Sequence, residues 1–418
     1  MGVPDRIQRE RDGDHLHARR SAAGDGGVRA RGRSCQPLRP RPGAGGRLDL
    51  DVRVDAGVTG GAVFDPFSGS YRAARERFRE AARAAAAPLQ HHLLAGAGPD
   101  GRELAIDVAL VGARNPRRAV VVSSGLHGVE GFFGSAVQLA WLSRLREGAV
   151  SIPGGTLVVL LHALNPFGFA WRRRANEDNV DLNRNFLDDD ETYAGTPDHY
   201  DRVHDLLSPA TPPSLLDAFR LRAAWAVRRH GLAVLQNAVA TGQYEHPSGL
   251  FFGGREATAP TRLIRERFWS WTRTADEVVH LDLHTGLGDY ADYRLLIEPP
   301  HVHDLDWYRA RFDPERVVPV GDDTPYAARG VMGAWLARHA GPRDYRFACL
   351  EFGTYGPLRV LAALRAENQA HHHATPAASA YERAKRELIE CFCPASGLWR
   401  HKALARALEV VGQAVGSE

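Results

Sequence analysis

The sequence predicts an α/β protein in three layers, with helices on both faces of a central mixed, mostly parallel sheet. Short apolar runs recur along the chain, at 118–124, 156–162 and 277–284, and amphipathic segments separate them. Strands that are apolar on both faces need cover on both sides, and helices between successive strands supply it. Glycines follow several of these strands, and the loops at such places build the sites of open α/β sheets.

The remaining elements follow from the same periodicities. We expect further strands at 104–111, 232–239, 294–298 and 345–352. We expect helices at 71–86, 131–146, 214–230, 261–274, 304–312, 330–340, 357–370, 378–392 and 397–413. Polar and aperiodic stretches predict loops at 165–186 and 187–212.

The composition predicts a disordered N-terminal segment that is followed by one folded domain. At 418 residues and 44% hydrophobic content the chain can bury a real core, and we assign residues 64–415 to a single catalytic domain. Residues 1–60 are rich in Arg, Gly, Pro and Asp and have no periodicity. This composition predicts disorder, or an extension that arises from a start codon assigned too early. The basic excess lies in this segment, so the rest of the chain predicts no nucleic-acid partner.

The sequence also predicts a cytoplasmic protein without a membrane partner. No stretch approaches the roughly 18 uninterrupted apolar residues of a membrane span, and the N-terminus lacks the apolar core of a secretory signal. Four cysteines in a chain of this length do not make a disulfide framework, and Cys391 and Cys393 have the wrong spacing for a CxxC pair.

Residues with ligand chemistry stand at three strand ends. His127 and Glu130 lie three residues apart in the glycine-flanked turn after strand 118–124, His284 ends strand 277–284, and Glu351 ends the strand at 345–352. A catalytic zinc needs three N or O ligands and an open fourth position, and two histidines with one glutamate meet this need. Glu351 then remains as a second carboxylate that could accept a proton from water.

The order of these motifs resembles the zinc carboxypeptidase superfamily, which includes carboxypeptidase A-like enzymes and the succinylglutamate desuccinylase and aspartoacylase branch. The motifs are His127-x-x-Glu130, Asn165-Pro166-Phe167-Gly168, Arg174, Asp181-Leu182-Asn183-Arg184-Asn185-Phe186, His284 and Glu351. The residues that make up these motifs are most similar to those of a bacterial branch of the superfamily, which is known chiefly as a domain of unknown function. The resemblance spans the chain from about Phe64 to the C-terminus.

The resemblance implies a role for each matching residue. His127, Glu130 and His284 would bind one zinc ion per chain, and Glu351 would be the general base and then the proton shuttle. Arg174 best matches the arginine that polarises the scissile carbonyl, with Arg172 and Arg173 as rivals.

Further residues match the substrate side of the family site. Asn183 and Arg184 match the pair that holds a terminal carboxylate, and Asp181 matches the acid that orients the first zinc histidine. The substrate-capping tyrosine has no clear counterpart, although Tyr326 is a weak candidate and Tyr355 a weaker one.

These features predict a zinc-dependent hydrolase of amide bonds, of the metallocarboxypeptidase type, that acts on peptides. Two alternatives stay open: a deacylase of N-acyl amino acids, and a catalytically silent binding protein that keeps the fold. A serine hydrolase is disfavoured because the sequence has no Gly-x-Ser-x-Gly elbow. A phosphate-loop enzyme is excluded because the only lysines, Lys385 and Lys402, stand in predicted C-terminal helices.

Overall fold

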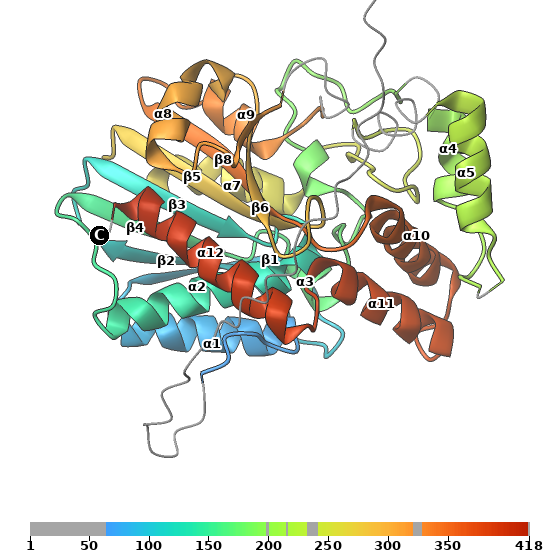
Figure 1. Cartoon of the computed structure of the whole chain (residues 1–418), viewed down its shortest axis with the longest axis horizontal. Coiled ribbons are helices and arrows are strands. Elements are labelled where there is room, and N and C mark those ends of the chain that lie inside the picture. The colour runs from blue at the N-terminus through green and yellow to red at the C-terminus, as the bar shows by residue number, and fades with distance from the viewer. Residues whose placement is uncertain (1–63, 198–199, 215, 232–240, 321–327, 417–418) are drawn as a thin grey trace, which may run out of the picture. The chain divides into compact units, whose positions relative to one another are not determined.

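The computed structural model describes residues 64–197, 200–214, 216–231, 241–320 and 328–416 (Figure 1). Within these ranges the chain forms one mixed sheet of eight strands in the order β1-β2-β4-β3-β5-β8-β6-β7. The strands are β1 (Leu89–Ala97), β2 (Glu103–Gly112), β3 (Arg118–Ser124), β4 (Thr156–His162), β5 (Glu277–Thr285), β6 (Tyr293–Ile297), β7 (Val317–Pro319) and β8 (Asp344–Phe352).

Parallel pairing dominates the centre of the sheet. Strands β4, β3, β5 and β8 pair parallel to one another, whereas β1 with β2, β2 with β4, and β6 with β8 pair antiparallel. The central strands are buried along nearly their whole length, as expected for a sheet that is covered on both faces. The predicted mixed, mostly parallel sheet is therefore confirmed.

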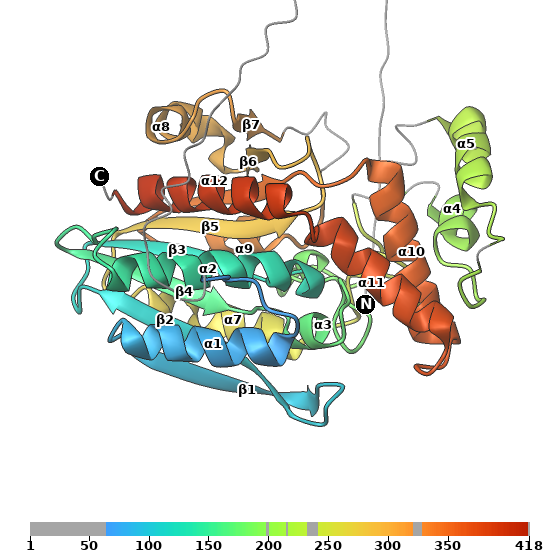
Figure 2. The same ribbon diagram turned by 60° about the horizontal axis from the view of Figure 1, so that its bottom comes forward.

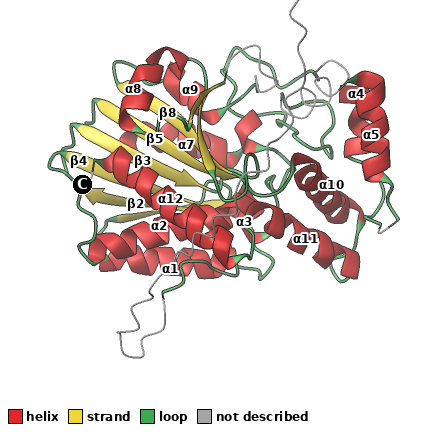
Figure 3. Ribbon diagram, in the orientation of Figure 1, coloured by secondary structure: helices red, strands yellow, loops and turns green. Residues whose placement is uncertain are grey.

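Helices cover the two faces of the sheet and give the predicted three layers (Figure 3). On one face pack α1 (Tyr71–Ala84), α2 (Gly131–Arg146) and α12 (Gly397–Val415), whose apolar residues share a core cluster with alternate residues of the central strands (Figure 2). On the other face, α7 (Ala259–Trp271) and α9 (Met332–Arg338) share a second cluster with the intervening strand residues.

The remaining helices lie around the edges of these layers. They are α3 (Pro166–Ala170), α4 (Tyr200–Leu207), α5 (Phe219–His230), α8 (Leu305–Arg311), α10 (Pro357–His373) and α11 (Ser379–Phe392). Short 3-10 turns lie at η1 (Gly128–Glu130), η2 (Leu182–Arg184) and η3 (His301–Asp304). None of the helices in the described ranges combines the length and the apolar character of a membrane span.

Four elements differ from the sequence prediction, and one of them is the short helix α3 (Pro166–Ala170), which begins inside the loop predicted at 165–186. Strand β1 was not expected, because it is an edge strand whose residues are mostly exposed and do not alternate. Helix α4 interrupts the loop predicted at 187–212, since its apolar residues Tyr200, Val203 and Leu207 fall on one helical face. The three-residue β7 is too short to produce a periodic pattern. The predictions for residues 1–60 and for a strand at 232–239 lie outside the described residues.

Candidate metal centre

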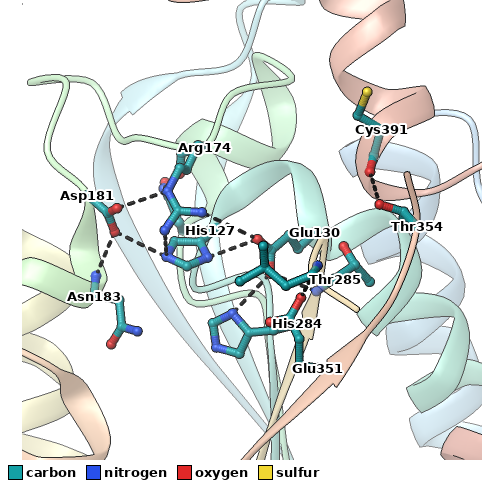
Figure 4. A network of polar contacts seen from close by, with 12 residues as sticks. His127, Glu130, Arg174, Asp181, Asn183, His284, Thr285, Glu351, Thr354 and Cys391 are labelled. Atoms are coloured by element: carbon teal, nitrogen blue, oxygen red, sulfur yellow. Dashed lines mark hydrogen bonds and ion pairs between the residues drawn. The ribbon is translucent and has the colours of Figure 1, made fainter. Parts of the chain in front are cut away.

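The candidate site lies where three neighbouring parallel strands end. Ser124 of β3 pairs with Leu283 of β5, and His284 of β5 pairs with Glu351 of β8. Parallel strands bring their carboxyl ends to the same edge of a sheet, so the turn after β3 and the last residues of β5 and β8 meet there. Figure 4 shows these side chains converging from the three elements.

The turn after β3 is held by the loop that follows β4. The first two N–H groups of η1 donate to the carbonyl oxygens of Arg174 and Arg173, at 3.1 and 2.7 Å. A Cβ atom on Gly128 would lie 2.1 Å from the carbonyl carbon of Gly168, so only glycine allows the two segments to approach this closely. The Gly-flanked turn and the Asn165–Gly168 motif therefore pack directly against each other.

His127, Glu130 and His284 form a compact group of buried ligand-type side chains. Their ligand atoms all lie within 4.8 Å of one another. The two oxygens of Glu130 face the two histidines, with Oε1 2.9 Å from Nδ1 of His127 and Oε2 3.0 Å from Nδ1 of His284. The backbone N–H of Thr285 donates to the same carboxylate at 3.2 Å.

A further carboxylate lies behind each histidine. Oδ1 of Asp181 lies 3.1 Å from Nε2 of His127, and Oδ2 of Asp282 lies 2.6 Å from Nε2 of His284. Histidines that ligate a metal usually donate their other N–H to such a partner, which fixes the tautomer and the ring orientation. Both Nδ1 atoms face Glu130 while both Nε2 atoms are held from behind, so the three residues fit a metal ion.

Asp282 was missed in the sequence analysis, although a signal for it was present. It stands two residues before His284 in β5, and residues two apart on a strand point to the same face. Asp282 is itself fixed by a hydrogen bond of 2.6 Å from the hydroxyl of Ser123.

The electrostatics of the group favour a bound cation. Burial acts to raise the pKa of Glu130, but the imidazoles of His127 and His284 outweigh it and lower the pKa to about 2. Burial likewise acts to lower the pKa of His284, yet Asp282 and Glu130 hold it well above its usual value. The carboxylates thus remain ionised in a buried place, where a positive charge stabilises them.

Glu351 lies beside this group, at the end of β8. Burial and then the charge of Glu130 raise the pKa of Glu351 to about 8. Its Oε1 accepts a hydrogen bond of 2.8 Å from the backbone N–H of Leu287. Cys349, two residues earlier on the same face of β8, forms a second group with His284 and Glu351 whose ligand atoms lie within 4.8 Å; the sequence analysis did not anticipate this thiol.

Arg174 is the arginine that reaches the candidate site. Its Nε donates to Oδ2 of Asp181 at 2.9 Å, and its Nη2 lies 2.7 Å from Nε2 of His127. Its Nη1 lies 3.7 Å from Oε1 of Glu130. The guanidinium therefore borders the metal-type ligands directly, as Figure 4 shows.

The two rival arginines pair elsewhere. Arg172 makes a bidentate pair with Glu382 of α11, at 2.9 and 2.8 Å. Arg173 donates from Nε to Glu367 of α10 at 2.9 Å, and from Nη2 to Asn179 at 2.8 Å. Three consecutive arginines thus point to three different partners, and only Arg174 faces the histidines.

Asn183 and Arg184 belong to η2, directly after Asp181. Oδ1 of Asp181 accepts a hydrogen bond from the Asn183 N–H at 3.1 Å, so the same carboxylate begins this turn and supports His127. Arg184 is buried, and its Nη1 donates to the Asn183 carbonyl oxygen at 2.7 Å. The predicted carboxylate-binding pair is thereby tied to the metal-type ligands through one aspartate.

Of the two tyrosine candidates, only Tyr355 lies in the described part of the chain, and it pairs away from this group. Tyr326 lies in 321–327, outside the described residues. The hydroxyl of Tyr355 donates to Glu390 of α11, and its ring lies under the guanidinium of Arg359. Tyr355, the weaker of the two candidates, thus contacts residues of α10 and α11.

Comparisons with known proteins place the chain in a family. The model of a family described as "Protein of unknown function (DUF2817)" matches residues 67–406. No curated protein matches the chain.

Several solved structures are similar to the chain. One is bovine thrombin-activatable fibrinolysis inhibitor in complex with tick carboxypeptidase inhibitor, at 12% identity and a TM-score of 0.46, over 85% of this chain and 98% of that one. Another is the carboxypeptidase A of Helicoverpa armigera, at 16% identity and a TM-score of 0.44, over 83% and 75% of the two chains. A third is the succinylglutamate desuccinylase of Chromobacterium violaceum, at 14% identity and a TM-score of 0.33, over 79% and 76%.

Proposed function

The chain belongs to the DUF2817 family of proteins of unknown function, and we propose that it is a zinc-dependent hydrolase of amide bonds, of the metallocarboxypeptidase type. One observation carries the proposal: two histidines and a glutamate bring their ligand atoms within 4.8 Å of one another, each histidine backed by a carboxylate. Zinc at His127, Glu130 and His284 would supply Lewis-acid activation of water and of the scissile carbonyl.

Glu351 serves as the general base in this proposal. Burial and the charge of Glu130 raise the pKa of this carboxyl to about 8, so it holds a proton more tightly than an ordinary glutamate does, and the charge of a zinc ion bound beside it would favour the ionised form that takes up the proton. The Leu287 N–H holds one of its oxygens, which leaves the other oxygen to take a proton from water and to return it to the leaving amine. Glu351 therefore acts twice in one turnover.

Arg174 stabilises the negative charge that develops on the carbonyl oxygen. An imidazole that binds a metal through Nδ1 carries its proton on Nε2, and on His127 this proton is donated to Asp181. With a metal held at Nδ1, the Nη2 of Arg174, which lies 2.7 Å from the same Nε2, would lose its acceptor there and would be available to a substrate oxygen. Metal binding and the availability of Arg174 are thus linked through one proton.

Asn183 and Arg184 bind the free carboxylate of the substrate. A guanidinium offers a fork of N–H donors to a carboxylate, and burial strengthens that interaction. This pair favours a peptide with a free C-terminus over a blocked one. A deacylase of N-acyl amino acids would use the same pair, and the two activities differ in the group on the other side of the amide.

The test combines metal analysis with a substrate panel. We expect one zinc per chain, and hydrolysis of peptides with a free carboxylate but not of their C-terminal amides. Glu351→Gln should keep the zinc and lose activity by at least about a thousandfold, because an amide cannot take up the proton. Glu315→Gln, which removes a carboxylate at an exposed position, is the matched control.

Three results separate the alternatives. Cleavage confined to N-acyl amino acids would replace the peptidase assignment by a deacylase. Zinc binding without hydrolysis of any amide would indicate a silent binding protein. Full activity in Glu351→Gln would refute the general base.

A further inference from the structure

A row of buried polar side chains leads away from the candidate metal centre, along the face of the sheet that α7 and α9 cover. This polar row consists of Asp282 and His280 on β5, Ser123 on β3 and Tyr345 on β8, none of them exposed by more than 6%. The rings of Phe268 and Phe347 both lie 5.1 Å from the ring of His280, so the row crosses an apolar core. Polar groups in such surroundings must find partners within the protein.

The strand register aligns the polar row with a metal ligand. His280, Asp282 and His284 stand two residues apart on β5, so their side chains point to one face of the sheet. Ser123 lies directly opposite Asp282 in the parallel pair of β3 and β5. The row therefore ends at His284, where the three strands present the candidate site.

Hydrogen bonds join every member of the polar row to the next. Oγ of Ser123 lies 2.6 Å from Oδ1 of Asp282 and 2.7 Å from Nε2 of His280. On the other side of its ring, Nδ1 of His280 lies 2.8 Å from the hydroxyl oxygen of Tyr345. The second oxygen of Asp282 lies 2.6 Å from Nε2 of His284. Four contacts thus connect Tyr345 to a metal ligand.

The donors and acceptors give these hydrogen bonds a defined order. An ionised Asp282 only accepts, so the Ser123 hydroxyl spends its single proton on Oδ1 and its oxygen must accept from Nε2–H of His280. Burial lowers the pKa of His280 to about 4, so this ring is neutral and carries one proton. Its Nδ1 is then an acceptor for the O–H of Tyr345. Tyrosine, histidine and serine therefore each donate towards Asp282.

We propose that Ser123, His280 and Tyr345 are positioning residues for the metal centre, because they hold Asp282 in the orientation that directs Nδ1 of His284 at the ion. This inference rests on the proposed function for the presence of zinc. With one oxygen held by Ser123, only the other oxygen of Asp282 is left for the histidine. Hydrogen bonds in a chain also polarise one another, so the loss of one weakens the next.

A purely structural role is the competing explanation, in which the polar row only satisfies polar groups that are buried in the core. Both roles predict a loss of stability when a member is removed. Only the positioning role predicts that the folded variants bind zinc more weakly. It also predicts that the effect grows as the substituted residue comes closer to Asp282, and that the effect requires the Asp282 carboxylate.

Chelator competition on the folded variants measures the zinc affinity. Ser123→Ala should weaken zinc binding by about tenfold, the lower end of the range for the loss of a direct partner of a ligand. Tyr345→Phe, which breaks the row at its far end, should weaken it by less. Ser124→Ala is the matched control, because this equally buried hydroxyl bonds to Gln138 and to the carbonyl oxygen of Leu161 instead. The control should bind zinc as the natural protein does.

Three further measurements test the path of the effect. His280→Gln can still donate to Ser123 and accept from Tyr345, so it should keep more zinc affinity than His280→Leu. Ser123→Ala should cause no additional loss when Asp282 is already Asn, because coupled residues are not additive. The absorption bands of the cobalt-loaded protein report the ligand geometry without reference to activity. They should shift in Ser123→Ala and stay in place in Ser124→Ala.

Zinc affinities of Ser123→Ala and His280→Leu that equal the natural one, beside a lowered thermal midpoint, would overturn the proposal in favour of the structural role. A full tenfold loss from Ser123→Ala on top of Asp282→Asn would also overturn it, since the effect would not pass through Asp282. Failure of the proposed function is visible separately. A chain that hydrolyses no amide but binds zinc with a Ser123-dependent affinity keeps the positioning residues and loses the hydrolase assignment. Hydrolysis by a chain whose zinc affinity is unchanged in Ser123→Ala does the reverse.

Discussion

Two buried groups of charged side chains contact the loop at 165–174, and their charges are balanced in different ways. The metal-ligand cluster consists of His127, Glu130 and His284. The helix-pair cluster consists of Arg173, Glu367 on α10 and Lys385 on α11, with side chains exposed by no more than 4%. Consecutive residues, Arg173 and Arg174, belong one to each.

The helix-pair cluster contains its own counter-charges. Oε1 of Glu367 accepts from Nε of Arg173 at 2.9 Å and from Nζ of Lys385 at 2.5 Å. Burial acts to raise the pKa of Glu367, but these two cations outweigh it and lower the pKa to about 2. Burial alone is therefore no sign of function, because this cluster needs nothing from outside the chain.

The metal-ligand cluster has the opposite balance. Glu130 faces two imidazoles, and Asp181 and Asp282 add two carboxylates behind them. In the metal-free chain, Arg174 and the proton that the raised pKa keeps on His284 balance these carboxylates, and a bound ion would take the place of that proton. The comparison predicts that changes in the first cluster alter metal binding, whereas changes in the second alter folding.

The largest effect is expected at Glu130. Glu130→Gln should lose tight zinc binding and at least about a thousandfold of hydrolysis, since it removes the ligand that faces both histidines. Zinc at a thousand times its dissociation constant should stabilise the natural protein by about 4 kcal/mol and stabilise this variant far less. Equal zinc-dependent shifts in melting temperature for the two proteins would refute the assignment.

Glu367→Gln should instead destabilise the fold. It leaves Arg173 and Lys385 buried without their carboxylate, which costs about 3–5 kcal/mol. Denaturant unfolding of the metal-free proteins measures this cost. The zinc content of the folded fraction should stay at one per chain, and its loss would show that the two clusters are not independent.

The same cluster predicts a pH dependence. The pKa of Glu367 is lowered from 4.5 to about 2, so its contribution to stability is present above pH 4.5 and is lost as the pH falls towards 2. The stability difference between the natural protein and Glu367→Gln should shrink by about 3 kcal/mol across this window. A difference that stays constant from pH 5 to pH 2 would contradict the ionised, paired state of this carboxyl.

Asp282→Asn tests the support behind a ligand. Removal of such a partner typically weakens metal binding by about 10- to 100-fold, because the imidazole loses its fixed orientation. Competition with a chelator gives the zinc affinity. Asp344→Asn, at the exposed start of β8, is the control and should bind zinc as the natural protein does.

The smallest effect is expected at Arg172. Its pair with Glu382 is partly exposed, and pairs of this kind contribute about 0–1 kcal/mol. Arg172→Gln should therefore retain its stability, its zinc and its activity.

Arg174→Gln, by contrast, should lose about 10²- to 10³-fold in kcat. Similar losses for the two variants would remove the distinction between these arginines.

The sequence was most informative where a pattern is local. His127, His284 and Glu351 stand at the ends of apolar strands, and both the strands and the order of the motifs can be read directly. Asp282 could have been found from its two-residue spacing to His284. The partners of Arg172 and Arg173 could not, because they lie on α11 and α10, about 200 residues further along the chain. Which of three consecutive arginines enters a site depends on this distant packing.

The way in which the ligands are distributed over the sheet has a consequence for assembly. Glu130 and the Thr285 N–H that binds it are 155 residues apart, and the central strands β3, β5 and β8 must already be paired before their ends can meet. A nascent chain therefore has no complete cage for the ion until synthesis has passed β5. Two separately expressed pieces divided between α2 and β5 should each leave zinc in solution and should capture it only after they reassociate, which would make zinc uptake a reporter of fragment complementation.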